Sequence, residues 1–395
     1  MKTIGHICVI ILLIVLFCGC QSEVTAPAVE VTAAPAPTLT PTPTVAPEPT
    51  PIATPDPIAA QIAAMSIEEK CGQLLVAGIE GLTAGADAIY AVTEVNAGGI
   101  ILFRRNIGSA EQVAALNQSL RSLATLPLLL CVDEEGGRVT RMPPDRNPLP
   151  AASKLTAETD FYALGKALGE ELIALGYNVD FAPVLDVFSN PRNTVIGDRA
   201  FGSDAETVIA QALPFAEGLA AAGILPVGKH FPGHGDTAED SHTALPLVRK
   251  TLDELEALEL LPFRAAVEAG MPAMMVGHIL LTELDAELPA SLSPAVVNGL
   301  LRGELGFDGV VFTDDLTMGA LKAYSLGERT VLAFEAGCDM LLICHGQKNL
   351  AEAHAALIAA VDEGRIRETQ LDESLERIFR FSLHASETIG QISNS

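Results

Sequence analysis

The sequence I-L-P-V-G-K-H-F-P-G-H-G-D-T-A-E-D-S-H at residues 224–242 joins an apolar run to a polar segment. Residues 224–228 have the length and composition of a buried β-strand. The segment from Lys229 onward contains two glycines and a proline within the four residues 232–235, which cannot continue a strand or a helix. We therefore predict a strand followed by a loop. Loops held by a rigid frame commonly carry the chemistry of a protein.

The same apolar character recurs eight times along the chain, in short runs rich in β-branched residues and leucine. The runs are Leu74–Ile79, Gly99–Phe103, Leu128–Val132, Val179–Val184, Leu225–Gly228, Ala273–Gly277, Val310–Thr313 and Met340–Ile343. Between them, Ala110–Leu123, Glu206–Ala222 and Asp253–Ala269 have apolar residues three and four positions apart, which is typical of amphipathic helices. Ser293-Pro294 predicts the start of another helix and Gly306 its end, because proline is favoured at the first helical position and glycine just past the last.

Apolar strands that alternate with helices predict a parallel sheet covered by helices. Eight strand–helix units in roughly 330 residues fit an α/β fold of the (β/α)8 TIM-barrel type, formed by a single catalytic domain over residues 58–395. Ser66-Ile67-Glu68-Glu69 predicts a capping box near the start of this domain. An open, doubly wound sheet is the alternative, but no G-x-G-x-x-G turn follows the first strand to favour it.

Polar side chains follow six of the runs, where each strand is predicted to end. They are Asp133 after the third run, Asp186 after the fourth, Lys229 and His230 after the fifth, His278 after the sixth, Asp314 and Asp315 after the seventh, and His345 after the eighth. In a (β/α)8 barrel the carboxyl ends of the strands meet at one rim, where active sites form. Contact with water explains one or two polar strand ends, but not six. The sequence therefore predicts an active site at this rim.

Two parts of this rim have side chains suited to catalysis. Asp314 follows an apolar strand, and a carboxylate in that place can attack an electrophilic carbon or accept a proton. An aspartate there can also cap the next helix, a role that suits Asp315 better. On the loop, the His242 imidazole can give and take a proton near neutral pH, and the Asp240 carboxylate can fix its tautomer.

The loop also contains residue types that bind metal ions. They are His230, His234, Asp236, Asp240 and His242. These could hold zinc or a harder ion. No H-E-x-x-H or similar helical spacing is present, however, and the glycines would leave the ligands poorly organised. We expect neither a metal nor another cofactor.

Composition narrows the class of partner. The formal net charge of −26 argues against nucleic acid, which is bound by basic surfaces. An acidic surface favours solubility and a neutral substrate. Four cysteines fall within residues 58–395, none in a C-x-x-C spacing. We expect buried free thiols rather than disulfides or a metal site.

The N-terminus has the features of a targeting segment. Met1-Lys2, the apolar stretch 7–17 and Cys18-Gly19-Cys20 are typical of a secretory signal, and the small residue before Cys20 predicts lipoprotein cleavage over residues 1–20 with lipid on Cys20. An uncleaved membrane anchor is the alternative. Residues 21–57 are rich in proline and threonine, which favours a disordered stalk. We expect an extracytoplasmic, membrane-tethered, monomeric protein.

Several motifs together resemble glycoside hydrolase family 3, and within it the bacterial β-N-acetylglucosaminidase branch. They are K-H-F-P-G-H-G at 229–235 with D-S-H at 240–242, G-F-D-G-V-V-F-T-D-D-L-T-M at 306–318, G-G-I-I-L-F-R-R-N at 98–106, D-E-E-G-G-R-V-T-R at 133–141, F-A-P-V-L-D at 181–186 and G-D-R-A-F-G at 197–202. Their order along the chain matches the family from about residue 62 to residue 345. The resemblance also implies a (β/α)8 barrel.

The resemblance implies specific roles for site residues. Asp314 would be the nucleophile, His242 the general acid and base, and Asp240 its partner. The residues that would hold the hydroxyls of the non-reducing sugar are Asp133, Arg141, Arg199, Lys229 and His230. The implied activity is retaining removal of terminal β-linked N-acetylglucosamine from peptidoglycan-derived fragments. A phosphorylase, a β-glucosidase-type enzyme and a non-catalytic cell-wall-binding lipoprotein remain open as alternatives.

Overall fold

A computed structural model describes residues 56–237 and 245–392, with side chains through Leu383. These residues belong to one compact unit, Thr54–Ser395. The predicted signal, Cys20 and the stalk as far as residue 55 lie outside the described residues. The last predicted stalk residue, Pro57, instead begins helix α1 (Pro57–Ala63), because the Asp56 carboxylate accepts a hydrogen bond from Ile58 N at 3.0 Å and caps the helix.

The described residues contain one eight-stranded parallel sheet, and each strand coincides with one of the eight predicted apolar runs. The strands are β1 (Leu75–Gly78), β2 (Gly99–Ile101), β3 (Leu129–Val132), β4 (Val179–Asp180), β5 (Leu225–Phe231), β7 (Ala273–Val276), β9 (Val310–Thr313) and β10 (Leu341–Ile343). They are fully or almost fully buried, which explains why they read as continuous apolar runs rather than as alternating patterns.

The sheet closes on itself. Its strand order is β10-β1-β2-β3-β4-β5-β7-β9, and β10 lies beside β9 through the bridge between Phe312 and Met340. Across this seam Thr313 N donates to Met340 O at 2.9 Å and Met340 N donates to Val311 O at 3.0 Å. The (β/α)8 prediction is confirmed, and the doubly wound alternative is wrong, because neighbours in sequence are neighbours in the sheet and no edge remains at this seam.

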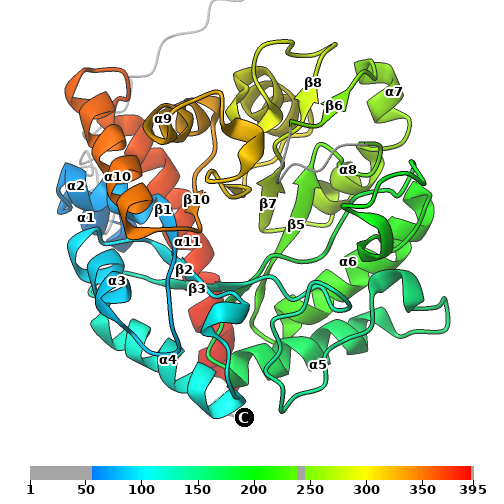
Figure 1. Cartoon of the computed structure of the whole chain (residues 1–395), viewed down its shortest axis with the longest axis horizontal. Coiled ribbons are helices and arrows are strands. Elements are labelled where there is room, and N and C mark those ends of the chain that lie inside the picture. The colour runs from blue at the N-terminus through cyan, green and yellow to red at the C-terminus, as the bar shows by residue number, and fades with distance from the viewer. Residues whose placement is uncertain (1–55, 238–244, 393–395) are drawn as a thin grey trace, which may run out of the picture. The chain divides into compact units, whose positions relative to one another are not determined.

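Helices connect the strands and surround the barrel (Figure 1). They are α2 (Ile67–Gln73), α3 (Ala86–Ile89), α4 (Ala110–Leu123), α5 (Phe161–Ala174), α6 (Ala205–Ala221), α7 (Leu252–Glu256), α8 (Leu261–Glu268), the helical segment η6 (Ala295–Glu304), α9 (Leu326–Ala336), α10 (Gln347–Asp362) and α11 (Glu368–Ile392). Short helical segments are η1 (Tyr90–Glu94), η2 (Arg104–Asn106), η3 (Ala152–Lys154), η4 (Gly197–Arg199), η5 (Ala290–Leu292) and η7 (Gly319–Leu321). A small parallel ribbon, β6 (Leu247–Val248) with β8 (Leu280–Leu281), lies apart from the barrel sheet.

Local sequence signals predicted most of these helices. The capping box at Ser66 is present, because Ser66 Oγ accepts from Glu69 N and the Glu69 carboxylate accepts from Ser66 N. The predicted helix Asp253–Ala269 is wrong in one respect, since it is broken into α7 and α8. Pro262 lies in the first turn of α8, where its missing N–H is tolerated, whereas inside a continuous helix it would remove a backbone hydrogen bond.

The strand prediction also fails at one end. We predicted a loop from Lys229, but β5 continues through Phe231. The pairing of β5 with β7 shifts register between Lys229 and Phe231, so His230 occupies an irregularity of the ladder. Such irregularities redirect a side chain without ending the strand. As a result Lys229 and His230 are held by the sheet itself.

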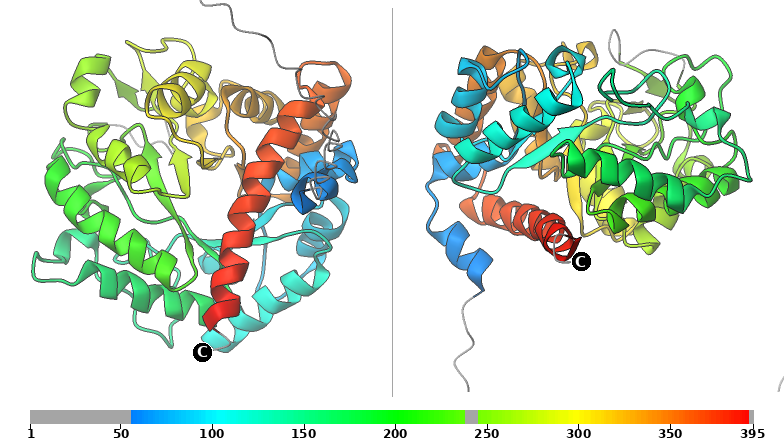
Figure 2. Two further views of the ribbon diagram at one scale, coloured as in Figure 1. Left: turned by 180° about the vertical axis from the view of Figure 1, so that it is seen from behind. Right: turned by 90° about the horizontal axis from the view of Figure 1, so that it is seen from below.

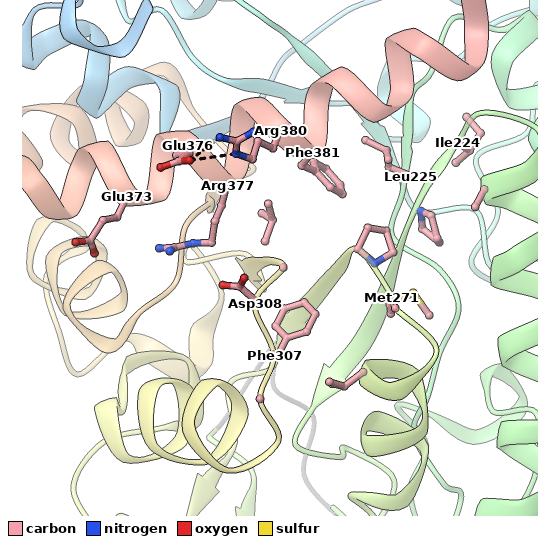
Figure 3. A pocket seen from close by; sticks show the side chains of 18 of the residues that line it. Ile224, Leu225, Met271, Phe307, Asp308, Glu373, Glu376, Arg377, Arg380 and Phe381 are labelled. Atoms are coloured by element: carbon pink, nitrogen blue, oxygen red, sulfur yellow. Dashed lines mark hydrogen bonds and ion pairs between the residues drawn. The ribbon is translucent and has the colours of Figure 1, made fainter. Parts of the chain in front are cut away.

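Helix α11 lies across the N-terminal ends of the strands, on the face of the barrel away from the viewer in Figure 1 (Figure 2). A cavity of about 860 Å³ lies between α11 and the starts of β5, β7 and β9 (Figure 3). Leu225, Met271, Phe307 and Phe381 give it apolar walls. The predicted site residues that the structure describes lie at the opposite ends of the strands and line a different cavity.

Two further findings concern the described residues as a whole. Cys71, Cys131, Cys338 and Cys344 are buried free thiols, as predicted. Among the described residues, no helix combines the length and the apolar character that crossing a membrane requires.

Candidate active site

A cavity of about 360 Å³ opens at the carboxyl ends of the strands. All the predicted site residues that the structure describes line it: Asp133, Arg141, Arg199, Lys229, His230 and Asp314. They come from strands far apart in sequence, and the parallel barrel brings them to one rim. Asp240 and His242 lie outside the described residues.

Asp314 stands directly after β9. Its N–H donates to Val276 O of β7 at 3.0 Å, which continues the ladder to the edge of the cavity. Its carboxylate Oδ1 accepts from Asp315 N at 2.7 Å. Burial raises the pKa of Asp314, but the His278 and His230 imidazoles outweigh it, so the pKa lies below its ordinary value. Asp314 is therefore an anion at neutral pH.

The adjacent Asp315 has a structural role. Its Oδ1 accepts from Thr317 N at 2.9 Å and from Cys344 N at 3.1 Å, and its Oδ2 accepts from Thr317 Oγ1 at 2.6 Å. These contacts cap the turn after β9 and tie it to the end of β10. The two neighbouring carboxylates thus differ in role, because both oxygens of Asp315 already accept hydrogen bonds from backbone and hydroxyl donors.

A network of alternating charges forms one wall of the cavity. Lys229 Nζ lies 2.6 Å from Asp133 Oδ1 and 2.6 Å from Glu135 Oε1. Glu135 also receives a forked contact from Arg199, whose Nε and Nη2 lie 2.7 and 2.8 Å from its two oxygens. Burial raises the pKa of Glu135, but Arg199 and Lys229 hold it well below its usual range. The wall is therefore a neutralised set of fixed donors and acceptors, suited to the hydroxyls of an uncharged ligand.

His230 is fixed by the neighbouring strand end. Its Nδ1 lies 2.7 Å from Asp186 Oδ2, and its Nε2 lies 3.3 Å from Arg199 Nη2. A carboxylate only accepts and a guanidinium only donates, so these two contacts fix the orientation of the ring. Asp186 Oδ1 also accepts from His234 N at 2.6 Å. Asp186 thus organises both histidines.

Part of the cavity lining is aromatic. The rings of Phe103 and His345 stack with centroids 5.7 Å apart and an angle of 24° between their planes. The Arg141 guanidinium lies 5.8 Å from the Phe103 centroid. The cavity lining therefore combines fixed charges with a flat, partly apolar ring surface.

A comparison with protein families matches residues 66–381 to the family described as "Glycosyl hydrolase family 3 N terminal domain". The match covers the whole barrel and every site residue discussed above. The chain belongs to glycosyl hydrolase family 3.

Curated and solved relatives agree with this family 3 assignment. A β-hexosaminidase of Methylococcus capsulatus is 44% identical over 273 residues, which are 67% of this chain and 80% of that protein. A β-hexosaminidase of Neisseria gonorrhoeae is 44% identical over 259 residues, 63% of this chain and 71% of that protein.

Among solved structures, a family 3 β-N-acetylglucosaminidase from Paenibacillus sp. is 44% identical, with a TM-score of 0.79. The alignment covers 82% of this chain, which spans only 63% of the Paenibacillus chain. A β-N-acetylhexosaminidase from Beutenbergia cavernae is 33% identical, with a TM-score of 0.76, over 81% of this chain and 99% of that chain.

Sequence reasoning missed two residues that organise this family 3 site. Glu135 was given no role, although it lies two positions beyond Asp133 in D-E-E-G-G and so faces the same side of an extended segment. Asp186 was expected at the rim but was given no function. The signal for both was present, because each is a carboxylate just past a strand end.

The metal alternative involved His234, which is buried. Its Nδ1 lies 2.7 Å from Thr237 Oγ1. Two of the side chains weighed as ligands, Asp240 and His242, are outside the described residues. Among the described residues, no group of three or more histidine, cysteine, aspartate and glutamate side chains is arranged to hold a metal ion.

Proposed function

We propose that this family 3 barrel is a retaining exo-β-N-acetylglucosaminidase that removes terminal β-linked N-acetylglucosamine from peptidoglycan-derived fragments. The observation that carries the proposal is the position of Asp314, an anionic carboxylate lining the same cavity as the charge-neutralised wall of Asp133, Lys229 and Arg199. A nucleophile thus faces donors and acceptors for sugar hydroxyls. The β-hexosaminidases of Methylococcus and Neisseria support the acetamido sugar as substrate.

In the proposed first step, Asp314 Oδ2 attacks the anomeric carbon, because Oδ1 is engaged by Asp315 N. The bond from this carbon to the leaving oxygen breaks, and His242, oriented by Asp240, gives that oxygen its proton. Water then attacks the glycosyl–Asp314 ester while His242 takes a proton from it. Two displacements at one carbon give net retention of configuration.

Asp314→Asn tests the nucleophile. We expect almost complete loss of kcat for an aryl β-N-acetylglucosaminide, because a neutral amide cannot form the glycosyl ester. Asp308→Asn is the matched control, since Asp308 precedes the same strand at its other end and is exposed. Full activity in Asp314→Asn would remove this residue from its role, and saturable glycan binding by the wild type without turnover would favour a non-catalytic wall-binding protein.

His242→Ala tests the acid and base. We expect kcat/KM to fall by about 10² to 10⁴ for a substrate with a poor leaving group. For a substrate whose leaving group departs without protonation, the rate of the first step should fall much less. An equal loss for both leaving groups would argue against protonation by His242.

Phosphorolysis is a second candidate, because this chain is also similar to a solved β-glucoside phosphorylase, at 26% identity with a TM-score of 0.77. The same Asp314 ester could be opened by phosphate instead of water. Product analysis in phosphate buffer distinguishes the two reactions, since phosphorolysis yields a sugar 1-phosphate and hydrolysis yields the free sugar.

We also propose that the enzyme works outside the cytoplasm as a lipoprotein anchored through Cys20. The signal-like residues 1–20 and the Pro/Thr-rich residues that follow support this. Cys20→Ser should move the protein from the detergent phase to the aqueous phase in a phase-partition assay. Unchanged partitioning would contradict a lipid on Cys20.

A further inference from the structure

Glu135 lies at the centre of the charged wall without an assigned role. It follows β3 by three residues, and the tight turn at Gly136 and Gly137, both with positive φ, directs the chain back so that Glu135 N donates to Val139 O at 3.0 Å. Its side chain is only 4% exposed and lines the cavity. Its two oxygens accept from Lys229 of β5 and Arg199 of η4, so Glu135 links the segments that follow β3 and β4 to strand β5 itself.

The donor count at Lys229 shows what Glu135 does. An ammonium group carries three N–H donors and no acceptor. The Asp133 and Glu135 carboxylates, each 2.6 Å from Nζ, engage two of these donors. One donor direction therefore remains for a ligand.

Arg199 is limited in the same way. Its guanidinium carries five N–H donors. Nε and one hydrogen of Nη2 go to Glu135, the other Nη2 hydrogen faces His230 Nε2, and Nη1 donates to Val195 O at 3.2 Å. Within the described part of the chain, one Nη1 hydrogen is left over.

We propose that Glu135 is a positioning residue that determines which sugar epimer the site accepts. It does so by using up donors on two cations, so that each presents a single donor in a fixed direction. A hydroxyl oxygen at the wrong configuration cannot meet a donor that cannot turn. This inference rests on the proposed glycosidase function and deepens it, and it predicts that the site distinguishes two sugars that differ only in the configuration of one hydroxyl, for which a pair of C4 epimers is the probe.

Glu135→Gln removes the charge and keeps the shape. Lys229 can then rotate toward Asp133 alone, and Arg199 loses its fork, so both cations can follow a displaced hydroxyl. We compare kcat/KM for the aryl β-N-acetylglucosaminide with kcat/KM for its C4 epimer, the aryl β-N-acetylgalactosaminide. The ratio of the first to the second should fall by about tenfold, which corresponds to the free energy of one well-placed hydrogen bond. KM should rise for the preferred sugar more than kcat falls.

Glu135→Asp is a second variant, which keeps the charge but is too short to reach both cations. The epimer ratio of kcat/KM in either variant that folds is sufficient to test the proposal. Asp339→Asn is the matched control, because Asp339 is also fully buried and bonds two arginines, Arg302 and Arg377, but lies before β10 on the other face of the barrel. Its epimer ratio should equal that of the wild type.

The proposal is overturned if the variants lose activity on both epimers equally, if the wild type does not distinguish the epimers, or if neither variant folds. If the wild type shows no turnover, the proposed function fails separately. Calorimetric binding of the two free N-acetylated amino sugars then tests Glu135 alone. The ratio of their two association constants is expected to fall in the variant.

Discussion

His234 is a basic side chain that folding removes from water. It is 2% exposed, and burial together with the neighbouring His230 ring lowers the pKa of His234 from 6.5 to about 4. Between these pH values the unfolded chain binds more protons than the folded one. Stability is therefore fully present above pH 6.5 and is lost as the pH falls toward 4.

We expect this residue to lower the free energy of unfolding by about 3 kcal/mol between pH 7 and pH 4, measured by urea denaturation. His234→Asn does not titrate and should lose much of this acid sensitivity. His354→Asn, on the surface of α10, should keep it. An unchanged pH slope in His234→Asn would show that other groups cause the acid instability.

Helices α5 and α6 pack closely against each other, and glycine makes their approach possible. A Cβ added to Gly165 would lie 2.0 Å from Phe215 O, and one added to Gly218 would lie 2.2 Å from Tyr162 O. Both neighbours are backbone atoms, which cannot move aside singly. Gly165→Ala should therefore force the helices apart and lower the free energy of unfolding by about 1–3 kcal/mol or more.

Gly299→Ala in η6 is the matched control for that prediction. The nearest atom to its added Cβ is Pro294 O at 3.7 Å, an ordinary contact. The substitution should be neutral or stabilise by about 0.4–1 kcal/mol, because alanine restricts the unfolded chain more than glycine does. Chemical denaturation of both variants checks the contrast, and equal effects would contradict the packing argument.

At the scale of the whole molecule, α11 closes the N-terminal end of the barrel. Its side chains Leu371, Leu375, Ile378 and Phe379 are buried. At about 1.5–3 kcal/mol for each buried side chain, they contribute about 6–12 kcal/mol, as much as the total stability of an ordinary domain. Lys70 adds a bond from α2 to Asp372 of α11 at 2.6 Å. A chain ending at Arg367 should therefore show no cooperative unfolding transition.

Two point variants test the contribution of single α11 side chains to stability. Phe379→Ala should lower the free energy of unfolding by about 3–5 kcal/mol. Leu383→Ala should change it by no more than about 0.5 kcal/mol, because that side chain is 49% exposed. A stable, cooperatively folding chain without α11 would show that the barrel is self-sufficient.

The strands were predictable because burial on both faces leaves a plain signal, a short apolar run. Helix α4 was predicted with both ends correct, since Ser109 caps its start and its apolar residues keep one period. The break between α7 and α8 was missed because the periodic pattern continues across it, and only Pro262 marks the interruption. The extension of β5 to Phe231 was missed because turn-forming residues follow so closely.

The membership of the site was also accessible from the sequence, because polar residues after parallel strands must share one rim. Asp133, Lys229 and Asp314 were found in this way. The assignment of partners was not accessible. That Glu135 binds Lys229 and Arg199, and that Asp186 holds His230, depends on distances between segments that are separate in sequence.

The sequence by itself determined the barrel, its strands and the residues at its mouth, because these follow from local periodicity and from the geometry common to parallel strands. Only the tertiary structure decided which carboxylate neutralises which cation and which donors remain for a sugar. The physical reason is that ion pairing depends on separations of a few ångströms between residues far apart in sequence, 96 positions for Asp133 and Lys229, and no local pattern encodes those separations.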